Sequence, residues 1–275
     1  MTDAPNFSLD DIIAKVARKP DPVAKPELWL LYSQPGSGKT FTASGVVDLS
    51  PDTNVLYIDV EGSTPGVITN HKNWENIDVL PVYEMVATDE EREDGVTNGI
   101  KRFKYLRSLL SEKYLFSGKD TKYDYVVIDT FDVAQDYAIE YFEREAQIAA
   151  QQAGGEVNGF AVWGDVKKWT LDVAKNLKSM KPVGILVQHD REEKSKSGAI
   201  VKKLAISGSA KDILPGIPDV VLYLERRLMG EDEVTVGYFA SEDGKVTKNR
   251  FGFPAKVKNP TIPALLEHIE KKAGK

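Results

Sequence analysis

A glycine-rich loop lies between an apolar run and a helix-compatible run near the start of the chain. Its sequence is Ser33-Gln34-Pro35-Gly36-Ser37-Gly38-Lys39-Thr40, and it follows Leu28-Trp29-Leu30-Leu31-Tyr32. A Gly-Lys-Thr sequence between a strand and a helix is typical of polyphosphate binding, because backbone N–H groups and the positive end of the helix converge on the anion. The loop therefore predicts a nucleoside triphosphate site.

Within this loop, Lys39 is expected to reach the β- and γ-phosphates, and the Thr40 hydroxyl is expected to bind Mg²⁺. Ser33 stands where the pattern G-x-x-x-x-G-K-[ST] has its first glycine, and we interpret this small residue as tolerated. The alternative, a Gly/Ser turn with a chance Gly-Lys-Thr, fits the strand and helix context poorly. The residues expected to contact ATP are Gln34, Pro35, Gly36, Ser37, Gly38, Lys39, Thr40 and Phe41.

The composition is that of an ordinary globular chain. Of its 275 residues, 41% are hydrophobic and 28% are charged, and no apolar run approaches the roughly 20 residues that span a bilayer. The absence of cysteine excludes disulfides and thiolate metal sites, and three scattered histidines do not form a zinc cluster. We expect a cytoplasmic protein that has no signal peptide and no membrane partner. The net charge of −6 argues against binding nucleic acid over the whole surface.

The chain divides into an N-terminal appendage, residues 1–26, and a single domain, residues 27–275. Apolar residues at positions 9, 12, 13 and 16 form a helical stripe, and the proline-rich stretch 20–26 indicates a linker. The helix could cap its own core or dock on a neighbouring subunit, and the sequence favours neither.

Strands and helices alternate through most of the domain. The apolar patterns predict strands at 54–62, 77–83, 123–130 and 182–189, and helices at 96–116, 131–153, 165–180 and 261–272, with a solvated acidic loop at 84–95. A late run of strands follows at 220–224, 234–239 and 244–247. This order predicts an α/β fold: a mostly parallel sheet flanked by helices, with a C-terminal antiparallel extension.

Two carboxylates follow predicted buried strands. Asp129 ends the most apolar strand and is expected to complete Mg²⁺ coordination, although it could also cap the next helix. Glu61 lies just past another strand and is expected to polarise a water for attack on the γ-phosphate. Asp59, two residues earlier, could serve instead, and either carboxylate could simply be satisfied by turn N–H groups.

Gln188 and His189 end a third apolar strand with polar groups. One of them is expected to sense the γ-phosphate or its water and to pass the nucleotide state to the loop that follows. The alternative is a pair of structurally satisfied side chains at a strand end.

That following segment, residues 194–211, contains lysines and no acid: Lys194, Lys196, Lys202, Lys203 and Lys211. A flexible basic loop could bind a phosphate backbone, although a solvated loop is the simpler interpretation. Phe160 and Trp163 could stack on bases, or both could be core.

Lys248 and Arg250 lie one residue apart in Lys248-Asn249-Arg250-Phe251-Gly252. Two such cations could stabilise transition-state charge on the nucleotide of the next subunit, or form a charged strand edge.

Taken together, these segments resemble the RecA-type ATPase core, in particular the phage-encoded RecA-like single-strand annealing ATPases and the bacterial RadA proteins. The matching residues are the loop at 33–40, Ile58-Asp59-Val60-Glu61, Val126 to Thr130, Val187-Gln188-His189 and Lys248 to Gly252, the last identical to a RadA signature. The chain lacks RadA's cysteine zinc finger and its protease-like C-terminal domain.

The resemblance implies an ATP- and Mg²⁺-dependent ATPase with Glu61 as catalytic glutamate and Asp129 beside the metal. Gln188 or His189 would be the sensor, where the family usually has Asn-Gln. Residues 154–164 and 190–211 would be DNA-binding loops, and Lys248 and Arg250 would reach the neighbour's γ-phosphate. The implied partners are single-stranded DNA, further copies of the chain in a filament or ring, and a single-strand-binding protein.

The leading functional hypothesis is an ATPase that binds single-stranded DNA and promotes annealing or strand exchange in phage recombination. A nucleotide-switched module that gates a partner protein with little turnover is an alternative. A small-molecule P-loop kinase is less favoured, because no arginine-rich lid segment follows the central strands.

Overall fold

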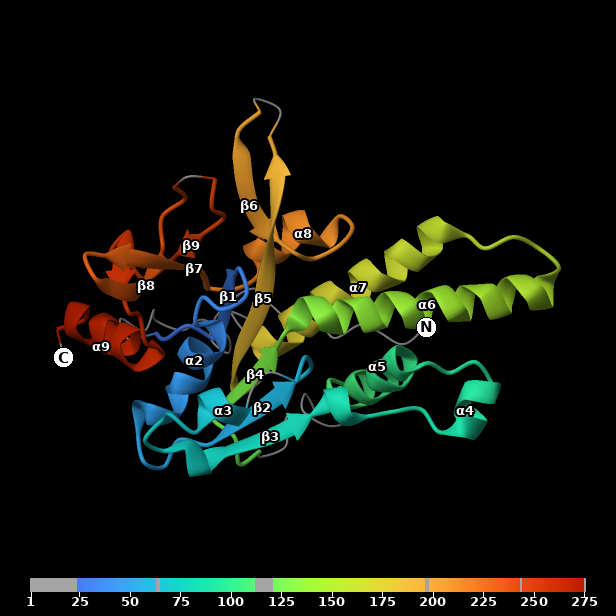
Figure 1. Ribbon diagram of the computed structural model, residues 1–275, viewed down its shortest axis with the longest axis horizontal. Helices are drawn as coiled ribbons and strands as arrows, with labels where there is room; N and C mark the ends of the chain where they lie inside the picture. Colours follow the sequence, from blue (N-terminus) through green and yellow to red (C-terminus); the bar gives the residue numbers. More distant parts are fainter. Residues whose placement is uncertain (1–23, 63–64, 112–120, 196–197, 243, 275) are drawn as a thin grey trace, which may run out of the picture.

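The computed structural model describes residues 24–62, 65–111, 121–195, 198–242 and 244–274. Its centre is one mixed sheet with the strand order β10-β8-β7-β1-β5-β4-β2-β3, in which β6 also pairs with β5 and β9 with β7. Helices cover both faces of this sheet (Figure 1). The predicted appendage lies almost wholly outside the described residues, so its helix is not placed.

The central strands are parallel, and their bounds are β1 Leu28–Ser33, β2 Val55–Asp59, β3 Ile77–Pro81, β4 Tyr125–Asp129, β5 Val183–Lys194 and β7 Val220–Met229. The antiparallel extension comprises β8 Asp232–Tyr238 and β10 Lys256–Lys258, and β9 Lys248–Asn249 runs antiparallel to β7. The predicted fold class, a mostly parallel RecA-like sheet with an antiparallel extension, is confirmed.

The register brings the predicted functional residues to one edge of the sheet. Ser33 pairs with His189, and Asp59 pairs with Asp129, which in turn pairs with Val187. Because parallel strands end at the same edge, the glycine loop and the strand-end carboxylates meet there, where open α/β sheets bind ligands.

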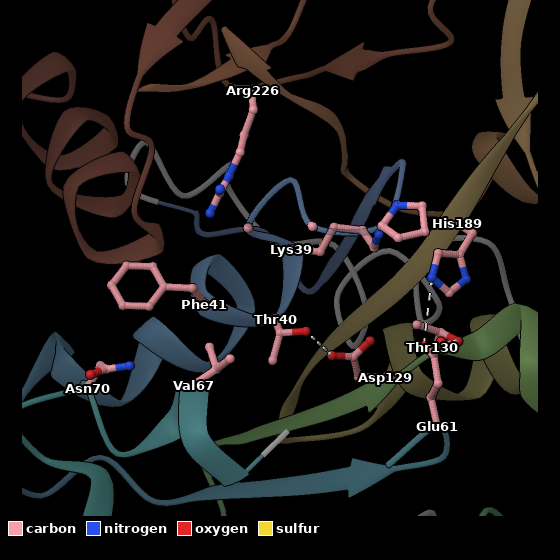
Figure 2. Close-up of a pocket in the computed structure, with 13 residues that line it drawn as sticks. Lys39, Thr40, Phe41, Glu61, Val67, Asn70, Asp129, Thr130, His189 and Arg226 are labelled. Carbon is pink, nitrogen blue, oxygen red and sulfur yellow. Dashed lines mark hydrogen bonds and ion pairs between the residues drawn. The ribbon is translucent and has the colours of Figure 1, made fainter. Parts of the chain in front are cut away.

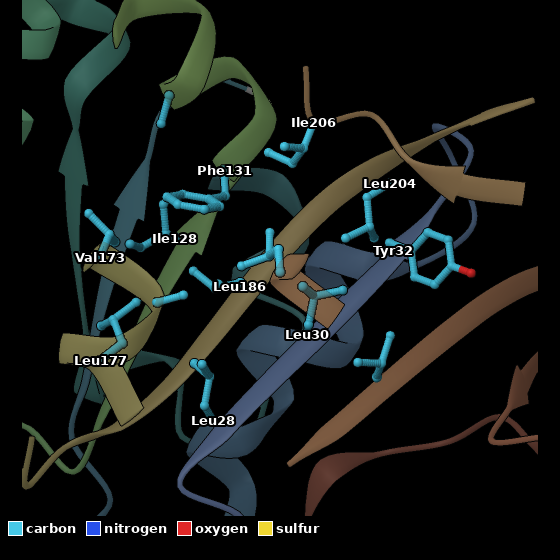
Figure 3. Close-up of a cluster of buried hydrophobic side chains, with 14 of the residues drawn as sticks. Leu28, Leu30, Tyr32, Ile128, Phe131, Val173, Leu177, Leu186, Leu204 and Ile206 are labelled. Carbon is cyan, nitrogen blue, oxygen red and sulfur yellow. The ribbon is translucent and has the colours of Figure 1, made fainter. Parts of the chain in front are cut away.

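The central strands are buried on both faces, which explains why their sequences are continuously apolar. On one face, Leu28, Leu30 and Leu186 pack against helices α5 (Asn98–Leu109), α6 (Phe131–Ala153) and α7 (Gly159–Ser179), as Figure 3 shows in part. On the other face, Trp29 and Leu31 pack with α2 (Lys39–Ser44), its continuation η1 (Gly45–Leu49) and α9 (Ile262–Lys272).

Short elements connect these layers: α3 Pro65–Ile68, η2 Trp74–Asn76, η3 Val82–Glu84, α4 Asp89–Glu93, α8 Ala210–Ile213 and η4 Leu214–Gly216. Thr261 caps α9 as the sequence predicts, accepting a hydrogen bond from Ala264 N. Among the described residues no helix is both long and apolar enough to cross a membrane.

Several boundaries differ from the sequence predictions. The segment 84–95 is not all loop, because Thr88 and Glu91 form a capping box that starts α4. Helix α7 begins at Gly159 rather than 165, because the Asn158 side chain accepts hydrogen bonds from Phe160 N and Ala161 N. The strand predicted at 244–247 is reduced to a bridge between Lys245 and Lys202.

The largest difference concerns residues 194–211, for which the sequence predicts a flexible basic loop. Strand β5 continues to Lys194 and pairs antiparallel with β6, Ile200–Leu204. The resulting β5–β6 hairpin projects from the sheet, and the α6–α7 helical hairpin projects in another direction (Figure 1).

Candidate nucleotide-binding site

The loop after β1 has the backbone that a phosphate cradle needs. Gly36 and Gly38 adopt φ of 77° and 92°, a left-handed conformation that favours glycine. A Cβ atom at Gly36 would meet nothing within 4 Å, so the backbone there is open to a ligand. Ser33 belongs to β1 and needs no positive φ, and its hydroxyl bonds with that of Ser37 inside the loop. Serine is therefore accommodated where the pattern has its first glycine.

Lys39 is the first residue of α2, and its ammonium group is folded back over the loop. Its Nζ donates hydrogen bonds to the carbonyl oxygens of Ser33 and Gln34, each at 3.0 Å. Burial lowers the pKa of Lys39, and the nearby carboxylates, Asp129 foremost, oppose that shift. The side chain thus holds a cation inside the loop, where the charge of a polyphosphate would be neutralised.

Thr40 and Asp129 are joined directly. The Thr40 hydroxyl donates to Asp129 Oδ2 at 2.7 Å, and the Tyr57 hydroxyl donates to the same oxygen. Asp129 is only 2% exposed, and burial raises its pKa. Oxygen ligands of this kind suit Mg²⁺. Among the described residues no group of three or more acidic or histidine side chains could hold a metal, so phosphate and water oxygens would supply the remaining ligands.

Glu61 and His189 lie side by side at one end of the site, and Asp132 contacts His189. His189 Nδ1 lies 2.8 Å from Asp132 Oδ2, and His189 Nε2 lies 3.7 Å from Glu61 Oε2. The Thr130 hydroxyl also donates to Glu61 Oε2, at 3.5 Å. The hydrogen bond with Asp132 raises the pKa of His189. Asp132 is not among the predicted residues, because its position in the first turn of α6 is that of an ordinary helix-start acid.

The structure distinguishes between the predicted alternatives at two strand ends. Asp59 is fully buried and its Oδ1 accepts a hydrogen bond from Gly62 N, so it is the turn carboxylate, whereas Glu61 lines the cavity. His189 lines the cavity too, but Gln188, its neighbour on β5, points to the other face of the sheet because strand side chains alternate. Gln188 is fully buried and neither side-chain polar atom has a hydrogen-bond partner among the described residues.

These groups line one cavity of about 480 Å³ (Figure 2). Glu61, Thr130 and His189 lie at one end, Lys39, Thr40 and Asp129 lie in the middle, and Phe41, Val67 and Asn70 lie at the other end, with Arg226 of β7 reaching in from the side. No sequence pattern marks Val67, Asn70 or Arg226 as site residues. The one possible signal for Arg226 is its place near the end of a predicted strand that pairs with β1, because such a residue can reach the glycine loop.

A comparison with protein-family models identifies the family of this chain. A family model described as an AAA domain matches residues 25–251. The chain belongs to this AAA-domain family. With its glycine loop and its sheet order, it is a RecA-like P-loop ATPase domain. No curated protein sequence matches it. Among solved structures, it is similar to the flagellar accessory protein FlaH from Methanocaldococcus jannaschii, with 12% identity, 92% of each chain covered and a TM-score of 0.47.

In this AAA domain, Lys248 and Arg250 lie away from the cavity of their own chain. Strand β9 pairs with the start of β7, at the amino-terminal ends of the parallel strands. The glycine loop lies at their carboxyl ends. Lys248 Nζ donates to the carbonyl of Gly216, and Arg250 Nη1 lies 3.2 Å from Asp219 Oδ1. Neither cation can complete the site of its own subunit, so their role in a neighbour's site stays a prediction.

Three of the five predicted DNA-binding lysines of the AAA domain are paired with acids that precede residue 194. Lys202 pairs with Glu192, and Lys203 and Lys211 both pair with Glu193, at 3.2 and 2.7 Å. The sequence analysis misses these ion pairs because it considers residues 194–211 separately from the acids at 192 and 193. Lys194 is exposed on the same hairpin, and Lys196 lies outside the described residues. The positive charge available to a phosphate backbone is smaller than predicted, and binding itself stays a prediction.

Phe160 and Trp163, the two aromatic residues predicted as possible stacking platforms, are not core. Phe160 is 92% exposed and Trp163 is 44% exposed. A Cβ atom at Gly208, just beyond β6, would lie 3.3 Å from the Trp163 ring, so Trp163 lies against the segment that follows the β5–β6 hairpin. The partly exposed Trp163 therefore lies near the β5–β6 hairpin, whose first strand carries His189.

Proposed function

We propose that this AAA domain hydrolyses ATP with Mg²⁺ and uses the reaction to bind single-stranded DNA and promote annealing or strand exchange in phage recombination. The observation that carries the proposal is the placement of Glu61, with the His189–Asp132 pair beside it, in the same cavity as Lys39, Thr40 and Asp129. A binding module without turnover would not require a carboxylate at that end of the cavity.

The hydrolytic step follows from these positions. Glu61 accepts a proton from a water molecule as that water attacks the terminal phosphorus, and the bond to the bridging oxygen breaks. Lys39 and the loop N–H groups neutralise the charge that develops on the phosphate oxygens. Thr40 and Asp129 would hold Mg²⁺, which supplies further charge neutralisation when bound. His189, fixed by Asp132, orients the Glu61 carboxylate.

Two features support binding of single-stranded DNA. Phe160 presents an almost fully exposed ring, and base stacking on such a ring is independent of sequence. Strand β5 carries His189 at the cavity and then forms the β5–β6 hairpin, so one continuous strand joins the nucleotide site to the proposed DNA-binding surface.

The proposal places Lys248 and Arg250 against the nucleotide of the next copy in a filament or ring. They lie at the amino-terminal ends of the parallel strands, and the glycine loop lies at the carboxyl ends. This position supports the arrangement, because subunits related head to tail would bring the two ends together. A single-strand-binding protein is the further partner that we propose.

The test measures ATP turnover with and without single-stranded DNA. Glu61→Gln is expected to lower turnover by about 10²- to 10⁴-fold and to keep ATP binding. Phe160→Ala is expected to weaken DNA binding by about 5- to 150-fold, whereas Leu228→Ala, an exposed apolar residue on the β7–β8 hairpin, should leave it unchanged. Slow turnover that DNA does not alter would favour the partner-gating module, and phosphate transfer to a small acceptor would favour a kinase.

The shared site has its own test. Arg250→Ala is expected to lower turnover by about 10³-fold. Mixing Arg250→Ala with Lys39→Ala should restore part of the activity, because an intact glycine loop of one subunit then meets an intact Arg250 of another. Full turnover of Arg250→Ala alone would contradict the shared site.

A further inference from the structure

The cavity has a direction that determines where the two ends of a nucleotide lie. Its water-activating group, Glu61, lies at one end, and the phosphate-binding residues Lys39 and Thr40 lie in the middle (Figure 2). The terminal phosphate must face Glu61, so the base must lie at the opposite end, beside Phe41 and Asn70. This inference rests on the proposed binding of a nucleoside triphosphate in the cavity.

Phe41 provides a fixed aromatic face at that end. Its ring is 43% exposed and stacks on His71, with ring centroids 4.6 Å apart and an interplanar angle of 28°. His71 is itself buried and held in place: its Nε2 lies 2.8 Å from Ser44 Oγ and its Nδ1 lies 3.2 Å from Asp48 Oδ2. One face of Phe41 therefore has a rigid support, and a ligand that stacks on the other face loses little entropy in ordering it.

Arg226 reaches into the same cavity from the side opposite Phe41. Figure 2 shows its guanidinium beside the glycine loop, with the Phe41 ring below it. Glu233 holds the guanidinium at 3.0 Å without burying it, since the Arg226 side chain is 52% exposed. A guanidinium is planar and stacks on flat rings, so Arg226 can cover a base that lies on Phe41.

Asn70 supplies the polar group at the far end of the cavity. Its Nδ2 donates to the carbonyl of Gly66 at 3.1 Å, and among the described residues no donor reaches its side-chain oxygen. A carboxamide offers one acceptor and one further donor, which matches the amino group and adjacent ring nitrogen of adenine. Guanine presents two acceptors at the equivalent edge and leaves the amide oxygen unpaired.

We propose that Phe41 and Arg226 enclose the nucleobase and that Asn70 selects adenine by pairing with its edge. The proposal assigns recognition of the base to residues outside the glycine loop, on α2, on the β2–β3 connection and on β7.

The experiment titrates the full chain with Mg²⁺ and ADP, GDP or inorganic tripolyphosphate, and measures heats of binding. The wild-type chain should bind ADP more tightly than GDP. Phe41→Ala should weaken ADP binding by about 5- to 150-fold and leave tripolyphosphate binding unchanged, because only the base contact is lost. Trp74→Ala is the matched control: Trp74 has the same 43% exposure but does not line the cavity, so neither affinity should change.

Two further variants separate the contributions. Arg226→Lys keeps the charge but loses the flat surface, and should weaken ADP binding with tripolyphosphate binding intact. Asn70→Ala should bring the ADP and GDP affinities together. Equal wild-type affinities for ADP and GDP, or a Phe41→Ala variant that loses tripolyphosphate binding as strongly as ADP binding, would overturn the inference. A wild-type chain that binds no tripolyphosphate would overturn the proposed function as well.

Discussion

Replacing Gln188 by methionine should stabilise this protein. Gln188 is fully buried, and its side-chain oxygen and nitrogen both lack a hydrogen-bond partner among the described residues. Burying a polar group of this kind without compensation costs about 1–3 kcal/mol in proteins. Methionine has a similar length and adapts its shape to the site, so the substitution removes the cost without creating a cavity. We expect the free energy of unfolding to rise by about 1–3 kcal/mol.

Gln135 is the matched control. It is also buried, at 1% exposure, but its Nε2 donates to Thr170 Oγ1 at 2.9 Å and its Oε1 accepts from Ser207 N at 2.6 Å. Gln135→Met would leave the Ser207 N–H without its acceptor, so the free energy of unfolding should fall by about 1–3 kcal/mol. The same chemical change should therefore have opposite signs at the two positions.

The assay is urea unfolding of both variants. An unchanged slope of the unfolding free energy against urea concentration would show that only the stability has changed. A Gln188→Met variant that is destabilised as strongly as Gln135→Met would refute the reasoning, because Gln188 would then have a partner in the folded protein. If it is stabilised, its ATP turnover should be compared with and without DNA. Turnover that no longer responds to DNA would explain why an unpaired amide is kept.

The remaining predictions concern pH and packing. The hydrogen bond with Asp132 raises the pKa of His189 above its ordinary 6.5, so its stabilising contribution is fully present below pH 6.5 and is lost as pH rises through the raised value. Urea unfolding across this range should show the loss in the wild type and a smaller one in Asp132→Asn; equal losses would contradict the assignment. A methyl group at Gly184 would lie 2.8 Å from a Leu28 methyl carbon, so thermal unfolding of Gly184→Ala should report destabilisation of about 1–3 kcal/mol. Gly216→Ala, with open space around it, should unfold like the wild type.

The sequence predicts a functional residue well when the same short segment forms a strand and carries the functional side chain. Apolar runs that end in Asp129 and Glu61 predict parallel strands, and parallel strands bring their ends to one edge of a sheet. The amino-acid pattern therefore predicts carboxylates at the strand ends near the glycine loop, although it leaves Asp59 and Glu61 as alternatives for the catalytic role. Asn70 and Arg226 carry no such signal. Each lies in a polar stretch, and only the packing of the β2–β3 connection and β7 around the loop brings them to the cavity.

The β5–β6 hairpin cannot be predicted from periodicity for a related reason. Hydrophobic alternation marks a strand only when one face is buried, and residues 190–194 project from the sheet with polar groups on both faces. The antiparallel pairing of β5 with β6 forms this extension, and the ion pair of Glu192 with Lys202, opposite each other on the two strands, contributes to it. In the sequence the lysines therefore resemble a free basic loop, although the acids that neutralise them lie only a few residues earlier in the chain.

The ambiguity between Gln188 and His189 has a geometric answer with a functional consequence. Neighbouring residues on a strand point to opposite faces, so only one of the two can face the cavity. His189 lies beside Glu61 and Asp132, whereas Gln188 is fully buried on the other face of β5. A substitution at His189 therefore perturbs the nucleotide cavity, whereas a substitution at Gln188 perturbs the buried interior on the other face of β5.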